Sequence, residues 1–328
     1  MKTIFIGIDI SKDTLDVAIC LNPEEGFLSE FQVENTVAGI QKMIKKCNLY
    51  PNPLWFCFEH TGNYGYLLCH QLSSSAFTYS MVPALEIKRS QGLSRGKTDK
   101  LDAQRIALYA ITHQHKLNAY ELKSEVLLKI KNLLTYRSQQ VNILRQYKNS
   151  LKSHRTTDIV IDNSYIIDDI RSTVEELIAK IKLIEKKIIR LIDQDDSLYK
   201  SFNKVRSVTG IGLIIAAYML VSTNNFSSFD NPRKYTCYAG IAPFEYSSGS
   251  SIKGKTKTNK LRNKTIKTLL FNGANTAVRT DPELKAYYKR KADQGKPHQV
   301  IINNIACKLV YRMFAVVKRD ELYVKLVR

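Results

Sequence analysis

The sequence lacks the cysteine spacing of a disulfide framework or a zinc site. No two cysteines form a Cys-x-x-Cys pair, and most lie in apolar runs. Such thiols are typical of buried free cysteines in a reducing compartment, so we expect a cytoplasmic protein. The six are Cys20, Cys47, Cys57, Cys69, Cys237 and Cys307.

The sequence also lacks a long hydrophobic run. The longest, residues 211–221, is well below the length of a membrane span. The apolar start is too short for a secretory signal and carries Asp9. We therefore expect neither a membrane partner nor export.

Acidic residues are scarce relative to basic ones. Among 328 residues, 50 Lys and Arg face 30 Asp and Glu, for a formal net charge of +20. This excess indicates a polyanionic partner, and nucleic acid is the first choice. Hydrophobic residues make up 44% of the chain, enough for the cores of two or three domains.

An acid interrupts the first apolar strand. Residues 5–10 read as a short β-branched strand that contains Asp9, and residues 16–21 read as a strand that returns beside it. A carboxylate in such a strand is costly to desolvate without a compensating cation or donor. Asp9 is therefore a metal ligand in a cleft or a turn residue at a strand end.

Further acids follow in the same region. The buried strand at 54–59 ends in Glu59, and Thr98 caps a helix that begins with Asp99 and Asp102. Residues three apart share a helix face. Alternating strands and helices predict an α/β domain over residues 1–118, with Arg95 and Lys97 in a basic loop before the last helix.

The middle of the chain reads as two long amphipathic helices, over about 121–155 and 166–192, without internal proline or glycine. We assign residues 119–198 to a helical region. The pattern suggests an antiparallel coiled coil or oligomerisation arm. A plain helical domain packed on its own core fits nearly as well.

Residues 199–328 form the third predicted domain, which is mainly helical. It opens with a glycine turn in which Gly210 and Gly212 precede an apolar helix. Such a turn can offer backbone N–H groups to a phosphate, or it can serve close helix packing.

A basic stretch follows, since no acid occurs between Glu245 and Asp281. It can neutralise phosphates, and a serine in it could attack a phosphodiester. From the residues alone we favour a phosphate-binding loop without a covalent role. Its cations are Lys253, Lys255, Lys257, Lys260, Arg262 and Lys264.

The four acids Asp9, Glu59, Asp99 and Asp102 repel one another if they meet. Divalent cations would neutralise them, and oxygen ligands suit Mg²⁺ or Mn²⁺. Each acid alone could be a solvated surface group, but the joint pattern is more specific. Bound metal of this kind supports phosphodiester chemistry.

The ordered segments 7–12, 59–64 and 97–103 resemble those of the DEDD transposases of bacterial insertion sequences, a family that includes the Piv-type DNA invertases. The resemblance covers essentially the whole chain. It implies a ribonuclease-H-like (RuvC-like) first domain whose metal-binding tetrad is Asp9, Glu59, Asp99 and Asp102.

The same resemblance extends to residues 240–264, which are similar to the serine-containing transposase domain of that family. It implies that Ser248, directly before a glycine, is the nucleophile, although Ser247 is adjacent. It further implies DNA recombination through a phosphoserine, assembly into a dimer or tetramer, and guidance by a non-coding bridge RNA.

Three other functions remain to be weighed. A RuvC-like domain could instead hydrolyse branched DNA with water and no serine. Residues 7–11 also resemble the first phosphate loop of sugar kinases, but the later glycine-rich nucleotide loops are missing from the sequence. A non-catalytic nucleic-acid-binding protein with structural acids is the last alternative.

Overall fold

The structure, a computed structural model, describes residues 2–90, 98–248, 252–258 and 263–324. It divides into two compact units, Met1–Leu122 and Lys123–Arg328. The three-part division expected from the sequence, with boundaries at residues 118 and 198, stays a prediction.

A five-stranded sheet organises the first unit. Strands β1 (Ile4–Ile10), β2 (Thr14–Asn22) and β3 (Gly26–Glu34) form an antiparallel meander. Strands β4 (Leu54–Glu59) and β5 (Thr78–Val82) run parallel to β1, which gives the order β3-β2-β1-β4-β5. The expected α/β class and the first hairpin are confirmed, and the sheet is compatible with a ribonuclease-H-like domain.

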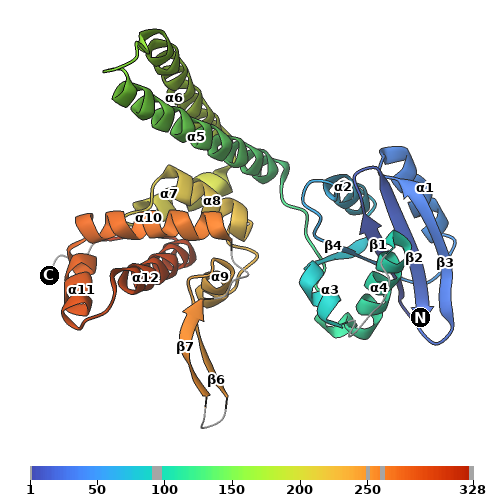
Figure 1. Cartoon of the computed structure of the whole chain (residues 1–328). Helices are drawn as coiled ribbons and strands as arrows, with labels where there is room; N and C mark the ends of the chain where they lie inside the picture. The colour runs from blue at the N-terminus through green and yellow to red at the C-terminus, as the bar shows by residue number, and fades with distance from the viewer. Residues whose placement is uncertain (1, 91–97, 249–251, 259–262, 325–328) are drawn as a thin grey trace. The chain divides into compact units, whose positions relative to one another are not determined.

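Helices cover both faces of this sheet (Figure 1). The isoleucines of β1 face α1 (Val37–Cys47) and α2 (Tyr66–Ser74), whereas Phe5 faces α3 (Ala84–Ser90) and α4 (Asp99–Thr112). The split follows from the period of two along a strand. A short 3₁₀ turn, Gln114–Lys116, follows α4.

Gly7 allows α4 to lie directly on β1. A Cβ placed on Gly7 would stand 2.3 Å from both the carbonyl oxygen of Ala103 and the backbone nitrogen of Ala107. No side chain fits in that space, so glycine permits the contact. The start of α4, with its two acids, is thereby brought near the end of β1.

The second unit begins with two long helices, α5 (Glu125–Thr157) and α6 (Ser164–Asp193), which pack against each other. Arg137 and Glu185 join them through an ion pair of 2.7 Å. Their residues near one end, including Leu127 and Ile188, belong to the core of the following helices. The two predicted helices are confirmed; a coiled coil stays a prediction.

The remaining helices bury their apolar faces in that core. A two-stranded hairpin, β6 (Pro243–Ser248) and β7 (Ile252–Thr258), lies between α9 and α10 (Figure 1). From the sequence, only a basic loop is expected there. The helices are α7 (Asp196–Ser207), α8 (Leu213–Thr223), α9 (Pro232–Tyr238), α10 (Lys264–Thr280), α11 (Pro282–Asp293) and α12 (His298–Arg319).

Helix α12 alone, among the helices that the structure describes, is long and apolar enough to cross a membrane. Its apolar residues, among them Ile305, Leu309 and Met313, are buried in the core of the second unit. Burial of this kind is what a core helix requires, and it accounts for the composition of α12.

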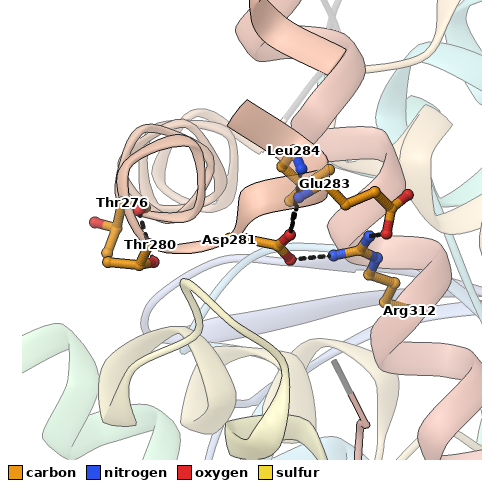
Figure 2. A network of polar contacts seen from close by, with 6 residues as sticks. All are labelled: Thr276, Thr280, Asp281, Glu283, Leu284 and Arg312. Atoms are coloured by element: carbon orange, nitrogen blue, oxygen red, sulfur yellow. Dashed lines mark hydrogen bonds and ion pairs between the residues drawn. The ribbon is translucent and has the colours of Figure 1, made fainter. Parts of the chain in front are cut away.

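A buried ion pair joins α11 to α12 (Figure 2). Asp281 caps α11 by accepting hydrogen bonds from the backbone N–H groups of Glu283 and Leu284, at 3.0 and 3.2 Å. Its other carboxylate oxygen accepts from Nη1 of Arg312 at 2.8 Å, and Nη2 of Arg312 donates to Glu283 at 2.7 Å. Asp281 is 4% exposed, so these partners compensate for its desolvation.

Candidate functional site

Strand alternation places three acids on the face of the sheet that α4 covers. On β1, Asp9 continues the series of Phe5 and Gly7, which faces α3 and α4. On β4, Glu59 continues the series of Trp55 and Cys57. Asp16 of β2 lies directly opposite Asp9 in the antiparallel register, so all three acids share one face.

Helix α4 adds the other two acids from its first turn. Thr98 caps the helix, and its hydroxyl accepts a hydrogen bond from the backbone N–H of Leu101 at 3.3 Å. Asp99 and Asp102 follow at the positive end of the helix dipole, a favourable position for carboxylates. Asp99 is exposed and Asp102 is half-buried.

The acids are close enough to affect one another. Burial, followed in decreasing order by the negative charges of Asp102, Asp99, Glu59 and Asp16, raises the pKa of Asp9 from 3.8 to about 6. Like charges that crowd in this way favour protonation or a cation. The structure therefore brings the four predicted acids, and Asp16, into one electrostatic neighbourhood.

The acids do not form a closed metal cage. Within the described ranges, no group of three His, Cys, Asp or Glu side chains is arranged to hold one ion. Asp102 is also engaged by Arg105, whose Nη1 lies 2.8 Å from its Oδ1. The carboxylate chemistry suits Mg²⁺ or Mn²⁺, but the side chains would have to draw together, so metal ligation stays a prediction.

Polar side chains of β3 hold the neighbourhood in place, although they belong to none of the sequence motifs. Gln32 donates from Nε2 to both carboxylate oxygens of Asp16, at 3.1 and 3.0 Å. Glu30 pairs with Lys100 of α4 at 2.9 Å and accepts a hydrogen bond from Gln104. The available signal was strand alternation, since residues 16, 30 and 32 share the face of Asp9.

A hollow of about 260 Å³ adjoins these groups. Its lining combines a buried carboxylate, a paired carboxylate and one lysine, which makes it polar with a small negative formal charge. The residues are Asp16, Val17, Glu30, Phe31, Gln32 and Lys100.

The predicted serine lies in the second unit. Ser248 is the last residue of β6, and its Cα pairs with that of Ile252 on β7. Lys253, Lys255 and Lys257 belong to β7, where Lys253 pairs with Ser247. Lys264 is the exposed first residue of α10. Arg95, Lys97, Lys260 and Arg262 lie outside the described residues.

The glycine turn has a packing role at one of its two positions. Gly210 has φ +89°, and a Cβ there would stand 2.5 Å from the carbonyl oxygen of Gly273 on α10. Gly212, in contrast, has no atom within 4 Å of its Cβ position. Close packing accounts for Gly210, and a phosphate contact by either glycine stays a prediction.

Comparison with known proteins identifies both parts of the chain. Residues 6–156 match a family model described as DEDD transposase of IS110, and residues 203–289 match one described as transposase of the IS116/IS110/IS902 family. The first match contains all four predicted acids, and the second contains Ser248.

Relatives over most of the chain carry consistent names. The chain is 27% identical to the pilin gene-inverting protein of Moraxella bovis, with 98% of each chain covered. It is 22% identical to a 43.6 kDa insertion element IS110 protein of Streptomyces coelicolor, over 98% of this chain and 95% of that protein. A transposase of insertion sequence element IS1533 from Leptospira borgpetersenii is also 22% identical, over 71% of this chain and 73% of that protein. The chain therefore belongs to the IS110 family of transposases and is an enzyme of DNA recombination.

Proposed function

We propose that this transposase cuts and rejoins DNA through a serine linkage, assisted by the acids of the first unit. The observation that carries the proposal is the crowding of Asp9, Glu59, Asp99 and Asp102, which adds to burial in raising the pKa of Asp9 to about 6. Such crowding is costly without a partner, and perturbed acids of this kind are typical of functional sites.

The four acids would hold Mg²⁺, or Mn²⁺ in its place. When bound, the ion supplies positive charge that stabilises the negative charge developing at the phosphate and at the leaving oxygen. Asp102 would have to exchange its contact with Arg105 for this role. The neighbouring Asp16 is held by Gln32 and would contribute charge without being a ligand.

Ser248 would supply the nucleophile. Its hydroxyl loses a proton and forms a bond to the scissile phosphorus as the bond from phosphorus to the 3′ oxygen breaks. The 3′ oxygen takes up a proton and leaves as a free hydroxyl. Attack of a second 3′ hydroxyl on the phosphoserine reverses these bond changes and joins the new strand.

The enzyme would work as a dimer or tetramer in which the acids of one subunit serve the serine of another. A non-coding bridge RNA would select the DNA sequences. The chain is suited to bind both nucleic acids, because its formal net charge is +20. Treatment with ribonuclease should then abolish sequence-specific strand exchange while leaving non-specific DNA binding.

Trapping the covalent protein–DNA adduct tests this function. Wild-type protein incubated with DNA carrying the element's ends should give an adduct that survives denaturing electrophoresis. Ser248→Ala should give none, whereas Ser247→Ala keeps it. Cleaved DNA without an adduct would instead favour a RuvC-like nuclease that uses water.

A further inference from the structure

A basic surface lies on α11 and on the helix that packs beside it, α12. Its members are Lys285, Lys289 and Arg290 of α11 with Lys308 of α12, and all four are exposed. We call this set the α11 surface. Within the described part of the chain, none of the four forms an ion pair with a carboxylate.

The acids at the start of α11 are already engaged. Figure 2 shows Asp281 and Glu283 both bound to Arg312, four residues after Lys308 on α12. Arg312 is therefore neutralised, whereas Lys308 is not. The helix dipole favours cations near the end of α11, but it gives no reason for the lysine that α12 adds.

One ring holds two of these cations together. The guanidinium of Arg290 lies 5.6 Å from the centroid of the Tyr287 ring, and Nζ of Lys308 lies 4.9 Å from the same centroid. The ring attracts each cation, and the two cations repel each other. An anion that binds beside this ring would interact favourably with both cations.

A hollow of about 450 Å³ lies beside α11, next to Arg290. Lys289 and Arg290 contribute to its lining together with the exposed acid Asp293. The neighbouring helices α10 and α12 contain no Asp or Glu, so they add no negative charge beside this surface. The surface thus has the charge and the extent to follow a phosphate backbone.

The aromatic side chains of α11 indicate whether this surface suits a duplex or a single strand. Tyr287 is half-buried with cations beside its ring, and the hydroxyl of half-buried Tyr288 hydrogen-bonds to Nδ1 of His298 at 2.8 Å. Proteins that bind single strands stack bases on open aromatic faces. Neither of these two tyrosines of α11 offers such an open face, which suits a double helix.

We propose that the α11 surface binds the phosphate backbone of duplex DNA. This rests on DNA being the substrate of the proposed function, and it adds a contact separate from the acids and from Ser248. Arg290 and Lys308 act as a pair on one strand, and Lys285 and Lys289 extend the contact along it.

The test is an equilibrium titration of full-length protein with a labelled duplex of unrelated sequence. Arg290→Ala combined with Lys308→Ala should weaken binding about tenfold at physiological salt and lower the slope of log affinity against log salt by about 2. Unchanged affinity for the duplex would overturn the proposal. So would a loss confined to single-stranded RNA.

Lys129→Ala combined with Arg171→Ala is the matched control. It removes the same charge, but each of these cations is already paired with a carboxylate on its own helix. We expect less than about a twofold change in affinity. Adduct formation by Ser248 is measured separately, so a protein that binds duplex through this surface yet forms no adduct contradicts only the proposed function.

Discussion

Gly7 of β1 and Ala103 of α4 meet backbone to backbone, at a distance that leaves no room for a Cβ on Gly7. This contact sets how near the first turn of α4 comes to Asp9, and hence how strongly Asp99 and Asp102 raise the pKa of Asp9. The candidate site therefore depends on a residue with no chemistry of its own.

Gly7→Ala should destabilise the first unit by about 3 kcal/mol, because the added methyl group forces α4 off the sheet. Denaturant unfolding measures this, with one probe in the first unit and a second probe in the second unit, where the control residue lies. Gly212→Ala is the control, since its Cβ position is open, and it should cost no more than about 1 kcal/mol. Equal costs for the two variants would contradict the close contact at Gly7.

Asp9→Asn should stabilise the protein above pH 6 in the absence of divalent metal. The folded-state pKa of Asp9 is raised to about 6, so folding favours the protonated form, and wild-type stability falls as pH rises from about 4 to 6. Asparagine carries no charge at any of these pH values, so the variant does not lose this stability as the pH rises. Because Asp9 is partly exposed, screening limits the gain to about 1 kcal/mol.

The unfolding midpoint, measured in chelator at pH 4 and pH 7.5, tests this expectation. The two proteins should be equally stable at pH 4 and differ at pH 7.5. A variant that is less stable than wild type at pH 7.5 would show that Asp9 makes favourable contacts as a carboxylate. It would contradict the conclusion that the neighbouring acids destabilise ionised Asp9.

Arg105→Gln should strengthen binding of Mn²⁺ several-fold. Arg105 neutralises Asp102 at 2.8 Å, so its removal leaves the acids more negative and frees one carboxylate. Titration calorimetry measures the affinity, with Lys129→Gln as a control for the loss of a positive charge. Weaker binding of Mn²⁺ would instead show that Arg105 holds Asp102 in position for the ion.

Asp281→Ala should destabilise the second unit by about 3 kcal/mol, since it removes the cap of α11 and leaves Arg312 without its buried partner. Glu283→Ala removes the other partner of Arg312, but this carboxylate is 53% exposed, so its loss should cost less than about 1 kcal/mol. Chemical unfolding compares the two variants, and similar costs would contradict the role given to burial.

Local chemistry made several elements predictable from the sequence. Thr98 caps α4 as a hydroxyl before a helix should. The apolar run that ends at Glu59 is strand β4 with the expected bounds. The two long helices followed from their spacing of apolar residues.

Other features depend on partners distant in sequence and could not be predicted in this way. The hairpin of β6 and β7 has lysines and small residues where a strand usually has β-branched ones, so its pairing was hidden. Gln32 next to Asp16 became visible only once β3 was placed beside β2, whereas Arg105 and Asp102 lie three residues apart on α4 and could have been paired from the sequence. Contacts between side chains of different strands leave no local motif in the sequence.

Binding of Mn²⁺ to the full-length protein tests the shared acid site most directly. Electron paramagnetic resonance of free Mn²⁺ gives the bound fraction for wild type, for Asp9→Asn and Glu59→Gln, and for the exposed control Asp230→Asn. The account predicts that wild type and the control bind the ion, whereas each of the two site variants loses at least about tenfold in affinity. Equal binding by all four proteins would contradict it.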